Sequence, residues 1–130
     1  MQRIDLPRRD DALRMTDSLR GLSQQLDRFA RERDWEQFHS PKNLASALIV
    51  EAAELLEHFR WMTEERSRML PPEKIEAVGA EVTDVLLYLV QLTNALGVDP
   101  VAAAQAKLEL NERRYPADRG RGSSRKHDEL

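Results

Sequence analysis

The sequence predicts an all-α fold, and two observations carry this prediction. Apolar residues recur three and four positions apart along most of the chain, which is the spacing of one helix face, whereas the alternation typical of a strand is almost absent. Proline and glycine divide this pattern into separate segments. With 130 residues, the chain holds one domain's worth of sequence.

Four helices are expected, each with its own boundary signals. Thr16 or Asp17 is a suitable N-cap for the first helix. Ser40–Pro41 and Asp99–Pro100 each place a capping residue before a proline, which is typical of the first turn of a helix. Gly97 is suited to end the third helix. The expected helices cover about residues 16–34, 41–64, 72–96 and 100–115.

We expect residues 16–116 to form one helical domain, between a flexible N-terminal segment, 1–15, and a flexible basic tail, 117–130. The third helix is apolar nearly all round, so every side of it must be covered. The three other expected helices are too short to cover all of its surface, so we expect the chain to self-associate into a homo-oligomer. The apolar residues of this helix include Val82, Val85, Leu86, Leu87, Leu89, Val90 and Leu92.

Composition narrows the classes of function. The absence of cysteine removes disulfides, thiolate metal ligands and cysteine nucleophiles, and it fits a cytoplasmic location. A net charge of −3 with mixed signs argues against a dedicated nucleic-acid-binding protein. No apolar run reaches the length of a membrane span and no secretion signal is evident, so we expect no membrane partner. The terminal HDEL is therefore interpreted as a chance charged ending.

Two pairs of acidic residues stand within otherwise apolar helices. Glu51 and Glu54 lie three residues apart in the second helix, and Glu81 and Asp84 lie three apart in the third. Each pair therefore shares a helix face. Burying a carboxylate without a partner costs roughly several kcal/mol. Three explanations are open: the acids take up protons, they pair with arginine or lysine, or they hold a metal ion.

The metal explanation fits the local composition best. Basic residues are scarce in these two helices, and four converging carboxylates suit a hard divalent cation. We expect Mg²⁺, and Mn²⁺ fits the same ligands. A single E-x-x-E on a helix is usually a solvated surface, and Glu57 is interpreted in that way. Other chemistries fit less well, because zinc would need more histidine or cysteine, a di-iron bundle would need Glu-x-x-His and neither acidic pair has it, and the chain has no P-loop and no G-x-S-x-G elbow.

The acidic pairs belong to a longer pattern. The chain has E-x-x-E at 51–54, E-x-x-D at 81–84, and the blocks RDWEQFHSPKNLA, EHFRW, EVTDVLLYLV and KLELNERRYPADRGRGSSRK. Over about residues 19–126 this pattern resembles the all-α NTP pyrophosphohydrolases of the MazG-like superfamily, in particular the dCTP pyrophosphatase branch. The resemblance implies a MazG-like helical fold assembled as a homodimer or homotetramer. It also implies Mg²⁺-dependent cleavage of a dNTP, foremost dCTP and 5-modified dCTP, to dNMP and pyrophosphate, for nucleotide pool sanitation.

The resemblance also implies the site residues. Four acids match the catalytic metal ligands: Glu51, Glu54, Glu81 and Asp84. Aromatic faces would stack on the base, Tyr88 would pack on the deoxyribose, and cations of the fourth helix and the basic tail would neutralise the triphosphate. For most of these side chains, a core aromatic or a solvated basic face is the ordinary alternative. The residues expected to bind substrate are Trp35, Phe38, His39, Trp61, Asp84, Tyr88, Lys107, Asn111 and Arg114.

One position departs from the resembled branch. Leu26 stands where the animal dCTP enzymes carry a histidine near the base, so cytosine preference is less firmly implied than the type of reaction. Two other functions compete with the leading one. The first is a broader-specificity NTP pyrophosphohydrolase, and the second is a non-catalytic helical module that binds a nucleotide or dimerises. The presence of all four acids at the expected spacing favours an enzyme.

Overall fold

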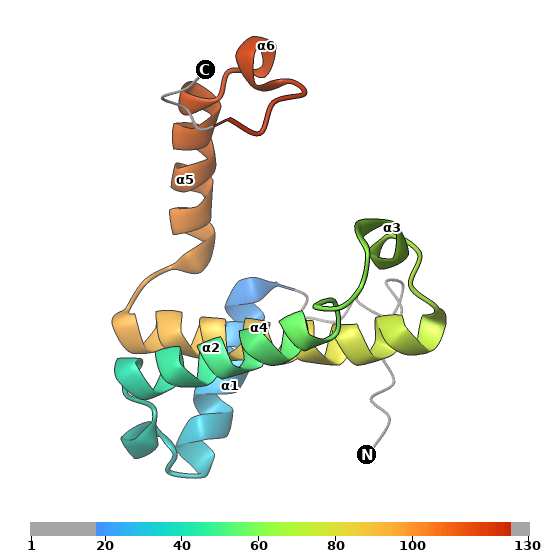
Figure 1. Cartoon of the computed structure of the whole chain (residues 1–130). Coiled ribbons are helices and arrows are strands. Elements are labelled where there is room, and N and C mark those ends of the chain that lie inside the picture. Colours follow the sequence, from blue (N-terminus) through green and yellow to red (C-terminus); the bar gives the residue numbers. More distant parts are fainter. Residues whose placement is uncertain (1–17, 126–130) are drawn as a thin grey trace. The chain divides into compact units, whose positions relative to one another are not determined.

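A computed structural model describes residues 18–125, and every regular element in this range is a helix (Figure 1). The all-α prediction is confirmed. The elements are α1 (Leu19–Glu32), the 3₁₀-helix η2 (Glu36–Phe38), α2 (Pro41–Glu57), α3 (Glu64–Ser67), α4 (Pro72–Leu96), α5 (Pro100–Arg114) and α6 (Ala117–Gly120).

α2 and α4 form the centre of the first part of the chain. They lie side by side and run in opposite directions, and α1 also packs against α4 (Figure 1). Each of these three helices contributes one buried apolar residue: Ala30, Leu44 and Val90. The Ser23 hydroxyl donates to Asn94 Oδ1, and Asn94 Nδ2 donates to the Ser23 carbonyl at 3.1 Å. This reciprocal pair fixes α1 on α4.

The chain divides into two compact units, Met1–Gly97 and Val98–Leu130. Gly97 ends α4 in the left-handed conformation, with φ at 67°, which a glycine adopts without steric cost. The Asp99 side chain caps α5 by accepting from the Val101 and Ala102 amides at 3.1 and 3.2 Å. The predicted third helix agrees with α4, and the predicted fourth helix agrees with α5 to within one residue.

The second predicted helix is too long. It begins at Pro41 as expected, with the Ser40 hydroxyl accepting from the Asn43 amide at 3.1 Å, but it ends at Glu57 and not at residue 64. The reason lies downstream, where the Thr63 hydroxyl accepts from the Arg66 amide at 3.2 Å and starts the single turn of α3. Threonine favours such a capping arrangement over the interior of a helix.

The chain ends differ in part from the predicted scheme. Ser18 caps α1 and accepts from the Gly21 amide at 2.9 Å, whereas Thr16 and Asp17, the predicted caps, lie outside the described residues. The N-terminal segment 1–15 also lies outside them, as does the end of the tail, 126–130. Within the predicted flexible tail, α6 forms one helical turn.

One stripe of α4 remains uncovered by the described part of the chain. Its residues follow one another at spacings of three, four or seven, so they share one face of the helix. They are Ile75, Val82, Leu86, Leu89 and Leu96, each at least 39% exposed. Contiguous apolar surface of this kind marks a contact region. Between residues 18 and 125 no single helix is long and apolar enough to cross a membrane, although α4 and α5 taken together pass that test by length and composition.

Candidate active site

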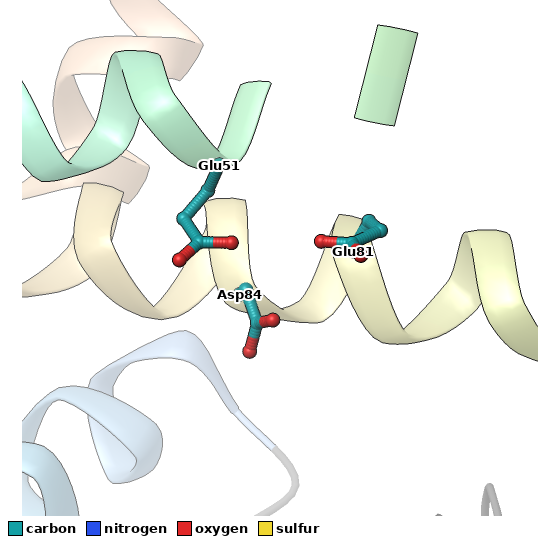
Figure 2. A group of neighbouring side chains, drawn as sticks. All are labelled: Glu51, Glu81 and Asp84. Atoms are coloured by element: carbon teal, nitrogen blue, oxygen red, sulfur yellow. The ribbon is translucent and has the colours of Figure 1, made fainter. Parts of the chain in front are cut away.

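Three carboxylates meet between α2 and α4. Glu51 extends from α2, and Glu81 and Asp84 come from adjacent turns of α4 (Figure 2). Each offers one oxygen, and these three oxygens lie within 4.8 Å of one another. The three-residue spacing of the α4 pair and the antiparallel packing of α2 produce this convergence.

No lysine or arginine between residues 18 and 125 neutralises the carboxylates of this acidic cluster (Glu51, Glu81 and Asp84). Glu51 Oε2 and Glu81 Oε2 are buried, and neither has a hydrogen-bond partner among the described residues. Within the same range the one basic group in ion-pair reach is His58, whose Nε2 lies 3.8 Å from Glu81 Oε1. Pairing with an arginine or lysine of the described range therefore does not explain the cluster. Protonation and metal binding remain.

Burial raises the pKa of Glu51 above its ordinary value. A side-chain hydrogen bond with Glu54 acts in the same direction, and the negative charges of Glu54, Asp84 and Glu81 raise this pKa further. All these causes disfavour the charged carboxylate. A cation placed among the three carboxylates would reverse the effect, because it favours the charged form.

The two other acids of α2 have different surroundings. Glu54 is exposed and contacts Glu51 from one turn away, outside the group of three. Glu57 is also exposed, and its carboxylate pairs with Arg60 at 2.7 Å on the surface. Surface pairs of this kind contribute little to stability.

The donor set fits a hard divalent cation. Carboxylate oxygens are the ligands that Mg²⁺ and Mn²⁺ prefer, and two of these oxygens are buried without another partner among residues 18–125. The cluster is half-buried, which leaves room for water or a phosphate to complete the coordination. The acidic cluster can therefore hold a divalent metal ion, whereas zinc and di-iron sites usually add histidine or cysteine ligands, which this group of three carboxylates does not contain.

A pocket of about 400 Å³ opens beside the acidic cluster. Asp84 belongs to both, so a ligand in the pocket would also reach a metal in the cluster. The size lies within the usual range for small-molecule sites. Apart from Asp84, the wall is mostly apolar and aromatic, and it consists of Leu26, Phe29, Trp35, His39, Leu87, Tyr88 and Gln91.

The end of α1 positions the indole of Trp35. α1 stops at Glu32, two residues before the predicted end, because Asp34 adopts a left-handed conformation with φ at 55°. The Trp35 amide then donates back to the Ala30 carbonyl at 2.9 Å. The rings of Phe29 and Trp35 meet edge to face with centroids 5.5 Å apart. This is a Schellman-type ending with its usual apolar contact, and it holds Trp35 against the pocket.

Four predicted substrate-binding residues line this pocket: Trp35, His39, Asp84 and Tyr88. Phe38 is 60% exposed and Trp61 is 85% exposed, and neither belongs to the wall. The Arg60 guanidinium lies 4.9 Å from the centre of the Trp61 ring.

The remaining three predicted substrate-binding residues lie on α5 in the second unit, where Asn111 is half-buried and the two cations are exposed: Lys107, Asn111 and Arg114.

Sequence reasoning missed several members of the wall. Gln91 follows Asp84 by seven residues, and the helical period that groups Asp84 with Tyr88 also extends to it. Phe29 fits the apolar face of the first helix, and Leu87 fits the apolar third helix. Nothing in their local sequence separates a pocket wall from a core, because that distinction depends on what packs opposite.

Comparison with known proteins establishes the relationship. Residues 47–130, which include all four predicted acids, match the MazG-like family. The chain belongs to the MazG-like family. This assignment agrees with the resemblance carried by the acidic pairs and their flanking blocks.

Individual MazG-like relatives agree with this assignment. The dCTP pyrophosphatase 1 of Homo sapiens is 48% identical over 104 residues, and that of Mus musculus is 45% identical over the same length. Each alignment covers 78% of this chain and 61% of the relative, so the chain spans about three fifths of the length of these curated relatives. The crystal structure of a pyrophosphatase from Archaeoglobus fulgidus DSM 4304 matches with a TM-score of 0.66 and 37% identity, covering 75% of this chain and 92% of that one.

The raised pKa of Glu51 predicts how stability depends on pH and on metal. Without metal, the folded protein holds the Glu51 proton more tightly than the unfolded chain does, so the free energy of unfolding should fall as pH rises from the ordinary glutamate pKa through the raised one. Mg²⁺ at ten times its Kd should then add about 1.4 kcal/mol at neutral pH. Thermal unfolding with EDTA or Mg²⁺ across this pH range measures both effects.

Two variants give the controls for this measurement. Glu51→Gln should be at least as stable as the wild type without metal at neutral pH, and it should lose the stabilisation by Mg²⁺. Glu57→Gln changes an exposed acid of the same helix and should respond to Mg²⁺ as the wild type does. Equal stabilisation of wild type and Glu51→Gln by Mg²⁺ would contradict a metal site at the acidic cluster.

Proposed function

We propose that the chain is a Mg²⁺-dependent nucleoside triphosphate pyrophosphohydrolase that converts a dNTP to dNMP and pyrophosphate, with dCTP and 5-modified dCTP as leading substrates. One observation carries the proposal: Asp84 belongs both to the acidic cluster and to the aromatic pocket. A metal site fused to a pocket with aromatic walls suits a ligand with a phosphate end and a flat ring end. The relatives named dCTP pyrophosphatase 1 support the same interpretation.

The acidic cluster provides the phosphate end of the proposed site. Glu51, Glu81 and Asp84 would hold the metal directly, and Glu54 would complete the set from the exposed side of α2. When bound, the metal supplies positive charge that offsets the charge developing on the phosphate oxygens. A water oxygen adds to the α-phosphorus, the bond from that phosphorus to the pyrophosphate oxygen breaks, and a carboxylate of the cluster accepts the water proton.

α4 sets the order of groups along the substrate. Asp84, Tyr88 and Gln91 follow one another at spacings of four and three on one face, spanning about 10 Å of helix. With phosphates at Asp84, the sugar would lie at Tyr88, and the base would lie between Trp35 and Gln91. Leu26 lines the pocket where the animal dCTP enzymes carry a histidine, so the wall near the base is more apolar in this chain. This supports the alternative of a broader NTP range. His39 adds a ring against Trp35, with centroids 6.3 Å apart.

Three further parts of the proposal concern the residues of α5, two exposed aromatic side chains and the choice of metal ion. Lys107, Asn111 and Arg114 recur at i, i+4 and i+7 on α5, and we infer that they bind substrate, with the two cations neutralising the triphosphate. Trp61 and Phe38 are exposed and do not line the pocket of a single chain, and we infer that they contact the nucleoside from outside that pocket. Mn²⁺ should replace Mg²⁺, because the carboxylate donors suit both ions.

We also infer that the protein works as a homo-oligomer, a dimer or a tetramer. The support is the uncovered stripe on α4, and Ile49 and Leu56 of α2 are exposed as well. A monomer would leave this apolar surface in water, at a cost that grows with its area. Burying it against a second copy would remove that cost.

Product analysis tests the reaction directly. The purified protein is incubated with each common dNTP and rNTP, with and without Mg²⁺, and products are separated by anion exchange. We expect metal-dependent release of dCMP and pyrophosphate from dCTP, and a loss of at least 100-fold in kcat for Glu51→Gln, Glu81→Gln or Asp84→Asn, a magnitude typical of removing one electrostatic group from a reacting centre, roughly 10²–10³-fold.

Two outcomes of product analysis would contradict the proposal. Release of orthophosphate would place the attack at a different phosphorus. Full turnover without any divalent metal would separate the reaction from the acidic cluster. The Glu57→Gln variant serves as the matched control and should keep the wild-type rate, because that acid pairs with Arg60 on the surface.

The oligomer is tested by light scattering coupled to size exclusion. The wild type should elute as a dimer or a tetramer of the 15.0 kDa chain. Val82→Glu or Leu86→Glu, which places charge on the uncovered stripe, should shift the mass towards the monomer while circular dichroism still reports helix. A monomeric wild type at micromolar concentration would contradict the inference.

A further inference from the structure

His58 connects the acidic cluster to a lysine outside it. The residue caps the C-terminal end of α2 and is half-buried. Its Nδ1 lies 3.0 Å from Lys74 Nζ, and its Nε2 lies 3.8 Å from Glu81 Oε1. Lys74 and Glu81 are seven residues apart on α4, so they share one face of that helix. The imidazole from α2 therefore bridges two turns of α4.

Lys74 determines which imidazole nitrogen carries the proton. An ammonium group has donors and no acceptor, so Nδ1 must accept the hydrogen bond from Lys74. In a neutral imidazole the proton is then on Nε2, the nitrogen that lies near Glu81. A donor thus faces Oε1 of the carboxylate, while Oε2 of the same carboxylate is buried without a partner in the described range. The two oxygens of Glu81 have different surroundings.

We propose that His58, held by Lys74, is a positioning residue that orients the Glu81 carboxylate for the metal. At 3.8 Å from Oε1, the Nε2 donor would attract that oxygen when the site forms, and Oε2 would then be available to the ion. Groups that hold metal ligands in this way commonly change metal affinity by about 10–100-fold when removed. The inference rests on the proposed function, because it assumes that the acidic cluster binds a divalent cation.

Simple electrostatics makes the opposite prediction for Lys74. A positive charge near a cation site weakens cation binding, so removal of the charge alone would tighten the binding of metal. If Lys74 acts through His58, its removal frees the imidazole and binding weakens. The sign of the change in affinity therefore separates the two roles, and a purely structural role for His58 predicts no change in either direction.

The test is Mn²⁺ binding by the full chain without nucleotide, measured by electron paramagnetic resonance. His58→Leu should weaken Mn²⁺ binding by about 10-fold. His58→Gln retains an acceptor for Lys74 and a donor for Glu81, and should restore most of the affinity. Lys74→Met should also weaken binding, and it should add nothing in the His58→Leu background, because the two residues act as one unit.

Arg60→Gln is the matched control for charge. Arg60 is a cation two positions from His58, but its partner is the exposed Glu57, so its removal should not weaken Mn²⁺ binding. Unchanged affinity in His58→Leu, or tighter binding in Lys74→Met, would overturn this inference alone. Absence of Mn²⁺ binding by the wild type would overturn the proposed function and the inference together.

Discussion

The burial of like charges between α2 and α4 is the constraint on which the site depends. Glu51 and Glu81 each keep one carboxylate oxygen buried without a partner among the described residues, and Asp84 adds a third negative charge within 4.8 Å. This arrangement opposes folding unless protons or cations neutralise it. In the chain without metal, burial and the neighbouring acids raise the pKa of Glu51. A divalent ion would neutralise the carboxylates and would bring a phosphate group to the same place.

α4 carries most of the other side chains of the candidate site. It is a continuous helix of 25 residues, and one run of its surface carries Lys74, Glu81, Asp84, Tyr88 and Gln91. α2 adds Glu51 and His58 from the opposite side, and the end of α1 adds Trp35. The proposed metal ligands, their proposed positioning group and the pocket wall are therefore all placed by their position on α4 or by packing against it. The apolar stripe on another face of α4 is exposed, and in the proposed oligomer it would contact the second copy.

The sequence predicted the features that depend on neighbouring residues alone, namely most helix boundaries and the residues that share a helix face. Asp99–Pro100 placed the start of α5 and Gly97 placed the end of α4, and the three-residue spacing of the acids predicted that each pair would share a face. The predicted end of α2 was wrong because Thr63 can lie inside a helix or cap the next one, and the sequence does not say which. Three of the four acids form the tight group because of how α2 lies against α4. Phe29, Leu87 and Gln91 join the pocket for the same non-local reason.

Crystals of the protein grown with Mn²⁺ and a non-hydrolysable dCTP analogue would show whether the acidic cluster holds the ion that binds the nucleotide. Anomalous diffraction locates manganese independently of any assumption about ligands. We expect an anomalous peak within bonding distance of oxygens of Glu51, Glu81 and Asp84, with the nucleotide phosphates on the same ion and the base against Trp35. Manganese on exposed acids such as Glu57, with the acidic cluster free of metal while the nucleotide is bound, would contradict this expectation.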